Sequence, residues 1–284
     1  MNIRQVRKKI KSISNVKKIT KAMQMVSAIK MKKAQQYALE GKPYRENLEK
    51  IIKKMVDSLD VKYSSLLTAE GVDTDKKLVI VISSNKGLCG AFHFNLFRHI
   101  LRNIDIRKSD FITLGRKGAL FVNRAGGTIL ADFSQSDQME TVSAVFRTAL
   151  AAFLDGKYKE IVLVHNKFIN TLRYDPLVKV ILPVKIENVL GGIVKIRTEY
   201  IIEPSPETII DALLRSFVEE EIRGAISESL AAEHSARMIA MKSATENAED
   251  VIYNLTFLRN KLRQEKITYE LLDMVTAKES VETV

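Results

Sequence analysis

The sequence predicts an α/β protein in which the N- and C-terminal helices form a long antiparallel coiled coil beside a central Rossmann-like α/β domain. Residues 1–40 contain neither glycine nor proline, and the segment after Pro206 contains one glycine, Gly224, and no proline. Between them, β-branched runs alternate with helical patterns. A terminal helix of about 70 residues would be about 100 Å long, whereas a small domain is about 30 Å across. Most of that helix is therefore expected to extend beyond the domain.

The N-terminal helix, expected over residues 1–60, has a narrow apolar seam. Its members recur at steps of three or four: Ile3, Val6, Ile10, Ile13, Val16, Ile19, Met23 and Val26. A seam this narrow favours a helical partner over a broad core. Pro43 lies where a helical pattern is interrupted and then resumes, so we expect a kink or a new helix start there.

The C-terminal helix, expected over residues 205–277, starts at Ser205-Pro206-Glu207, which offers a serine cap and a proline in the first turn. Its seam is predicted as Ala244, Ala248, Val251, Leu255, Leu258 and Leu262. The two terminal seams can cover each other as an antiparallel pair; the alternative is two unrelated helices packed on the middle domain. Residues 278–284 are predicted to form a tail outside the helix, because burying Lys278, Glu279 and Glu282 unpaired would be costly.

The central domain is expected over residues 75–204, after a loop at 61–77. Four strands are predicted at 78–83, 110–115, 128–133 and 160–165, with helices at 91–102, around 120–122 and at 139–154. This alternation is typical of a parallel sheet. Two further β segments, at 177–184 and at 189–202, are expected to close the domain, turning at Gly191-Gly192.

No catalytic, cofactor or metal site is predicted. The turn at 86–90 has neither the GxxxxGK[ST] nor the GxGxxG spacing, so a glycine-dependent tight turn is favoured over phosphate binding. Cys89 has His93 one helical turn away but is expected to be a small buried apolar residue. The remaining histidines lack metal-ligand spacing, and residues 219–221, three consecutive glutamates, are expected to form a solvated face.

The net charge of +11 is concentrated at the N-terminus, where eleven lysines and arginines precede Glu40, the first acidic residue. Such a segment is compatible with nucleic-acid binding, membrane-surface binding, a transit peptide, or simply a solvated helix face. The apolar stripe runs on without a cleavage-like break, which argues against a transit peptide. A basic coiled-coil nucleic-acid-binding protein is the alternative function, although the chain has no recognisable reading motif and no tryptophan.

Three motifs carry a family resemblance that spans nearly the whole chain. Residues 10–28, IKSISNVKKITKAMQMVSA, resemble the N-terminal signature of the gamma subunit of the F-type rotary ATP synthase, and the stretch from Glu233 to Leu271 resembles its C-terminal signature. The turn SNKGLCGAF at 84–92 is similar to the family's Ser-Asp-Arg/Lys-Gly-Leu-Cys-Gly motif, except that Asn85 replaces the usual aspartate and His93 a usual asparagine. These two departures put the polar network at the turn in doubt.

The resemblance implies a non-catalytic central-stalk rotor that binds no cofactor and no nucleic acid. Its partners would be three alpha and three beta subunits, the epsilon subunit and the membrane c ring, at the cytoplasmic face of the bacterial plasma membrane. Contacts with an acidic loop of beta would involve Lys17, Lys18, Lys21, Met23 and Arg237. Contacts with a catch loop higher in the ring would involve Arg263, Gln264 and Thr268.

Overall fold

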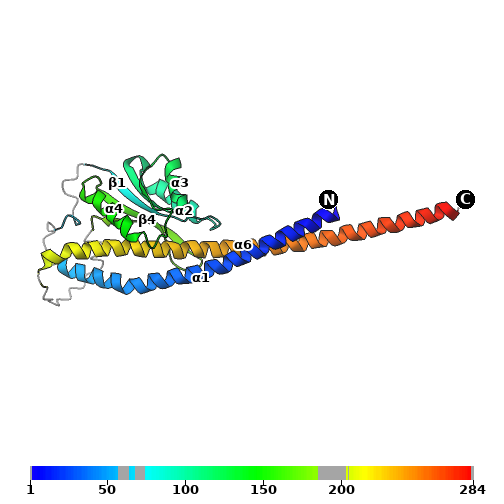
Figure 1. Cartoon of the computed structure of the whole chain (residues 1–284), viewed down its shortest axis with the longest axis horizontal. Helices are drawn as coiled ribbons and strands as arrows, with labels where there is room; N and C mark the ends of the chain where they lie inside the picture. Colours follow the sequence, from blue (N-terminus) through cyan, green and yellow to red (C-terminus); the bar gives the residue numbers. More distant parts are fainter. Residues whose placement is uncertain (1, 57–63, 68–73, 185–202, 204, 283–284) are drawn as a thin grey trace. The chain divides into compact units, whose positions relative to one another are not determined.

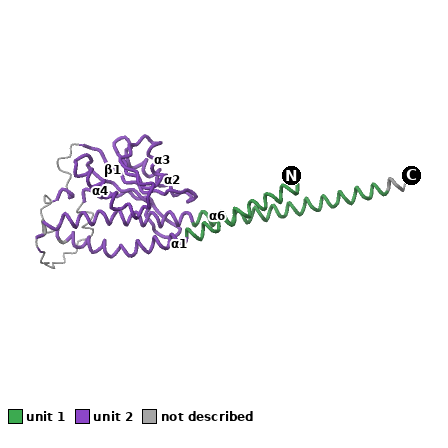
Figure 2. Tube along the Cα trace, in the orientation of Figure 1, with its two compact units in different colours: residues 1–27, 238–284 green, residues 28–237 purple. Residues whose placement is uncertain are grey.

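The computed structural model describes residues 2–56, 64–67, 74–184, 203 and 205–282. Two helices dominate the chain: α1 runs from Ile3 to Val56 and α6 from Pro206 to Glu282. The chain divides into two compact units, residues 1–27 with 238–284, and residues 28–237 (Figure 2). Both long helices contribute to both units.

The larger unit contains a five-stranded sheet in the order β3-β2-β1-β4-β5. The strands are β1 (Lys77–Ile82), β2 (Ser109–Leu114), β3 (Thr128–Asp132), β4 (Glu160–Phe168) and β5 (Tyr174–Leu182). The first four are parallel, as predicted, and β5 joins β4 antiparallel through a tight connection. The predicted β segment at 189–202 lies outside the described residues.

Helices cover both faces of this sheet, with strand residues alternating between two cores (Figure 1). Helices α2 (Phe92–Asn103) and α3 (Arg116–Arg124) pack over Val79 and Val81. Helix α4 (Val142–Leu154) packs on the opposite face, over Leu78, Ile80 and Ile82, together with parts of α1 and α6. A short 3-10 helix, η2 (Ile106–Lys108), precedes β2. Portions of both long helices therefore belong to the core of the domain.

Within the smaller unit, α1 and α6 pair in antiparallel order. Thr20 hydroxyl lies 2.8 Å from Thr245 hydroxyl, and Lys17 Nζ lies 2.8 Å from a carboxylate oxygen of Glu249. Residues further along α1 therefore pair with residues earlier in α6. The antiparallel pairing predicted from the sequence is confirmed here.

The seam of α1 follows a stricter heptad pattern than predicted. Non-exposed positions at alternating steps of three and four are Ile3, Val6, Ile10, Ile13, Lys17, Thr20, Gln24 and Ser27, and Ser14, Met23 and Ala28 beside them are also partly buried. Met23 and the first four agree with the prediction, but Val16, Ile19 and Val26 are wrong, being 48%, 59% and 53% exposed. From residue 16 onward, apart from Met23 and Ala28, the apolar side chains up to Ile29 lie on a neighbouring face, and polar residues occupy the seam. On α6, Ala248, Leu255 and Leu262 are at least partly buried as predicted, whereas Val251 is exposed.

Two further predictions about the long helices need correction. Helix α1 continues through Pro43 as one element, which rules out the new helix start and leaves the kink as a prediction. Helix α6 continues to Glu282 and does not end near Ala277. All described side chains from Arg263 to Lys278 are exposed. A helix can carry Lys278 because this side chain remains in water. No helix among the described residues is long and apolar enough to cross a membrane.

The turn after β2 depends on a glycine, and a glycine in α1 provides a matched control. Gly115 has φ 100°, and a Cβ there would lie 2.5 Å from the Ser83 carbonyl oxygen. We expect Gly115→Ala to lower the free energy of unfolding by about 2–4 kcal/mol, through strain and overpacking. A Cβ added at Gly41 would have nothing within 4 Å, so Gly41→Ala should raise the free energy of unfolding by roughly 0.5–1 kcal/mol. Urea unfolding measures both, and a neutral Gly115→Ala would contradict this packing.

Candidate functional site

The first place to look for a ligand site is the switch point of the sheet, between β1 and β4. Strand order reverses there, and open α/β sheets bind ligands outside the carboxyl ends of the strands at such points. The turn that follows β1, residues 83–91, occupies this position. It requires left-handed backbone at Leu88 (φ 62°) and Gly90 (φ 58°). The glycine-dependent tight turn predicted from the sequence is therefore present.

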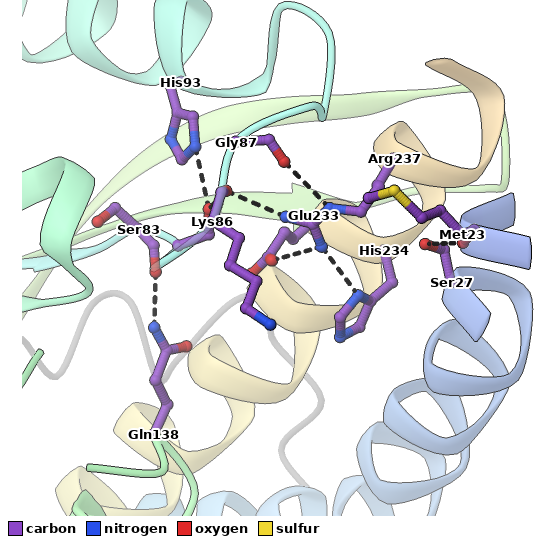
Figure 3. A network of polar contacts seen from close by, with 11 residues as sticks. Met23, Ser27, Ser83, Lys86, Gly87, His93, Gln138, Glu233, His234 and Arg237 are labelled. Carbon is purple, nitrogen blue, oxygen red and sulfur yellow. Dashed lines mark hydrogen bonds and ion pairs between the residues drawn. The ribbon is translucent and has the colours of Figure 1, made fainter. Parts of the chain in front are cut away.

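The switch point is occupied by α6 of the same chain. The Arg237 guanidinium donates from Nη2 to the Lys86 carbonyl at 3.1 Å and from Nε to the Gly87 carbonyl at 3.2 Å (Figure 3). Its Nη1 lies 2.7 Å from Oε1 of Glu233 and 3.3 Å from Nδ1 of His234. Arg237 is 7% exposed and Glu233 8% exposed. This buried arginine therefore joins the turn of the domain to the long helix.

Burial governs the electrostatics of this network. It raises the pKa of Glu233, although the adjacent Arg237 charge opposes that shift. It also lowers the pKa of His234 to about 4, with further contributions from the positive charges of Arg237 and Lys30. His234 is therefore neutral at physiological pH, which lets its Nδ1 accept the bond from Arg237.

The two unusual residues of the turn are accommodated by direct bonds. Asn85 Oδ1 accepts from the Arg116 backbone N–H at 2.9 Å. His93 Nε2 lies 3.0 Å from the Ser84 hydroxyl, and burial lowers the pKa of His93. Asparagine and histidine at these positions are thus each held by a hydrogen bond, while the buried Nδ1 of His93 has no partner among the described residues.

Cys89 is buried, as predicted, and packs with Phe92, Ala232 and Ala236. Burial raises the pKa of its thiol, which opposes formation of the thiolate that a nucleophile needs. Two small alanines on α6 let the turn approach the helix closely. The cysteine therefore serves as a packing residue.

Arg237 is the last of a series of polar ties between α6 and the rest of the larger unit. The other pairs, in order along α6, are Asp211 with Ser64, Glu219 with Ser143, Glu221 with Lys179, Glu228 with His165, and Ser235 with the Thr171 carbonyl. The prediction of a solvated face at residues 219–221 is corrected here. Glu219 and Glu221 tie α6 to α4 and β5, and Glu220 pairs with Arg223 on the same helix.

The predicted contact residues fall into three situations. Lys18 and Lys21 are exposed on α1, and Arg263, Gln264 and Thr268 are exposed on α6. Lys17 and Met23 are partly buried, and Lys17 is paired with Glu249. Arg237 is buried and bonded within the chain, as described above. The structure therefore presents two exposed sets, one on each helix, and the internal network of Arg237, whose partner Glu233 the sequence analysis did not single out.

The described residues contain no group of three or more His, Cys, Asp or Glu side chains that could hold a metal ion. The carbonyls of the β1 turn are satisfied by Arg237, so the position at which related sheets bind ligands is filled by protein.

The ATP synthase family model matches residues 2–281. The chain is 35% identical over 283 residues to the ATP synthase gamma chain of Variovorax paradoxus, covering 96% of each chain. It is 35% identical over 286 residues to that of Janthinobacterium sp., covering 98% of this chain and 99% of the relative. The chain belongs to the ATP synthase gamma chain family.

Solved structures agree at the level of the fold. A chain of the Euglena gracilis mitochondrial ATP synthase, in a structure described as OSCP/F1/c-ring, rotational state 3, matches with a TM-score of 0.67 and 19% identity, covering 98% of this gamma chain and 94% of the other chain. A chain from the rotor structure of the same enzyme matches with a TM-score of 0.62 and 19% identity, covering 93% and 98%. The gamma-chain fold, with two long helices and a central sheet domain, is thereby confirmed.

The depressed pKa of His234 gives the gamma chain a testable pH dependence. An unfolded histidine has a pKa near 6.5, so protonation of His234 favours the unfolded state. The contribution of neutral His234 to the free energy of unfolding is fully present above about pH 6.5 and is lost as pH falls towards about 4. We expect the free energy of unfolding to drop on the order of 2 kcal/mol more in the natural chain than in His234→Gln across this window. Urea titrations at successive pH values measure the difference, and parallel curves would contradict the burial of a neutral His234.

Proposed function

We propose that this gamma chain is the central-stalk rotor of an ATP synthase and has no catalytic activity of its own. The observation that carries the proposal is the pairing of two long helices whose outer faces are exposed, on a domain whose ligand position is filled by protein. The related structures are described as a rotor and as an F1 and c-ring assembly. By that likeness, the partners of this chain are the alpha and beta ring, epsilon and the membrane c ring, with peripheral attachment at the cytoplasmic face of a bacterial plasma membrane.

The exposed apolar side chains of the helices support a surrounding partner. Val16, Ile19 and Val26 form a stripe on α1 next to the seam. On α6, the exposed stretch after Leu262 carries Ile267, Leu271, Leu272, Met274 and Val275, each at least 43% exposed. Contiguous exposed apolar surface of this kind marks an interaction site. We propose that this stretch of α6 lies against an apolar inner surface of the alpha and beta ring.

The charged contacts complement these stripes. Lys18 and Lys21 lie on the exposed side of α1, beside Ile19, where they can meet an acidic loop of beta. Arg263, Gln264 and Thr268 occupy one exposed stretch of α6, where they can meet the catch loop. Because a rotating shaft presents different faces to three identical sites, it biases each of them towards a different conformation. That differential contact would couple rotation to ATP synthesis.

Charge reversal tests this proposal in the assembled enzyme. Changing both Lys18 and Lys21 to glutamate would place like charges against the acidic loop, which is costly. We expect ATP synthesis in reconstituted vesicles to fall roughly tenfold, equivalent to about 1.4 kcal/mol. The melting temperature of the chain should change by less than about 2 °C, since exposed charges contribute little to folding.

The matched control reverses Arg107 and Lys108, an exposed basic pair on the central domain. This change should leave synthesis near the natural rate. The chain alone, without alpha and beta, should hydrolyse no ATP. Hydrolysis by the purified chain that a substitution within it abolishes, or full coupling in the Lys18/Lys21 variant, would contradict the proposal.

A further inference from the structure

The space beside Gly224, the one glycine of α6, is filled by the side chain of an arginine of α1. A Cβ at this position would lie 1.9 Å from Nη1, 2.6 Å from Cζ and 3.3 Å from Nε of Arg45. The guanidinium therefore fills the space that any side chain at 224 would need. Glycine is among the poorest helix formers, so its place in the interior of α6 has a steric explanation.

Arg45 occupies a seam position of α1 within the larger unit. The heptad that begins at Ile3 continues through small residues at Ala38 and Gly41, and returns to large apolar residues at Leu48 and Ile52. Arg45 stands between these two sets and is itself partly buried. Its guanidinium reaches α6 at the one position where that helix lacks a side chain.

The same arginine acts on Glu228, one helical turn beyond Gly224. Burial alone would raise the pKa of Glu228, but its bond to His165 and the nearby charge of Arg45 outweigh burial and lower it. A carboxylate oxygen of Glu228 lies 3.5 Å from Nε2 of His165, which is 3% exposed on β4. Arg45 of α1 thus packs on Gly224 of α6, and Glu228, one turn further along α6, pairs with His165 of the sheet.

We propose that Arg45, seated on Gly224, is a positioning residue that holds α1, α6 and the sheet together as one body. The planar guanidinium packs on the bare backbone of α6, and its positive charge favours the carboxylate of Glu228, which pairs with His165. Its mechanical consequence rests on the proposed rotor function. Under load, a helix pair fixed to the domain in this way turns with it instead of sliding past it.

A double-mutant cycle on the full chain tests the packing of Arg45 on Gly224. Helix propensity alone predicts that Gly224→Ala raises the melting temperature. With Arg45 present we expect it to fall by about 2–4 °C, because the new methyl group expels the guanidinium. In an Arg45→Ala background the same change should raise it by about 2–4 °C. Gly41→Ala, with open space around it, should raise it in both backgrounds. An equal change in melting temperature on Gly224→Ala in both backgrounds would overturn the proposed packing of Arg45 on Gly224.

The mechanical role is tested in the complete membrane enzyme, well below the melting temperature, by the number of ions pumped per ATP hydrolysed. Gly224→Ala and Arg45→Ala should each lower this ratio about twofold, an effect that a merely stabilising contact would not produce. Arg45→Lys, which keeps the charge but loses the planar group, should restore part of it. Natural coupling in all three variants would overturn the mechanical role. Failure of the natural chain itself to support coupling would instead contradict the proposed rotor function.

Discussion

The register in which α1 and α6 pair is the constraint on which the rest of this molecule depends. A seam that alternates steps of three and four keeps one face of each helix turned to its partner. Apolar residues alone would tolerate slippage, but the described seam places Thr20 against Thr245 at 2.8 Å. A slip by one turn would separate these two hydroxyls and lose their hydrogen bond. Polar seam residues set register in coiled coils in the same manner.

At the switch point of the sheet, a buried polar contact likewise fixes the position of α6. The chain fills that position with Arg237, whose buried pairing with Glu233 would be costly to break. A site that binds ligands in related sheets becomes an attachment point between turn and helix. Together with the ties at Glu219, Glu221 and Glu228, this attachment fixes α6 to α4, β5, β4 and the turn after β1. Such a body is suited to transmit force, and it leaves the outer faces of the helices to partners.

Much of this could be predicted from the sequence, for identifiable reasons. The strands β1, β2 and β4 are largely buried apolar runs because both faces of the sheet are covered there, and such runs are easy to locate. The seam was predicted correctly from Ile3 to Ile13, where apolar residues occupy it, and at Met23, but wrongly at Val16, Ile19 and Val26. There the seam carries Lys17, Thr20, Gln24 and Ser27, so apolar periodicity marks the neighbouring face.

Other features depend on pairings between distant residues, which no local pattern reveals. The glutamates at 219–221 look like a solvated face in sequence, but their partners lie on α4, on β5 and one turn along α6. Arg237 belongs to a conspicuous motif, yet only the fold shows that it is buried. The role of Gly224 required knowledge of Arg45, which is far away in the chain. The helix was expected to end near Ala277 because burying the charged residues beyond it would be costly, but Lys278 is exposed on α6 and the helix continues to Glu282.

The register of the helix pair can be tested most directly by a cross-link. Thr20→Cys with Thr245→Cys places two thiols at the closest polar contact of the seam, and the natural Cys89 is buried and unreactive. If the helices pair in this register and turn as one shaft, mild oxidation should link the two positions almost completely. ATP-driven rotation of the assembled enzyme should then continue at its natural rate. Failure to form the link, or rotation that stops when the link forms, would contradict the account.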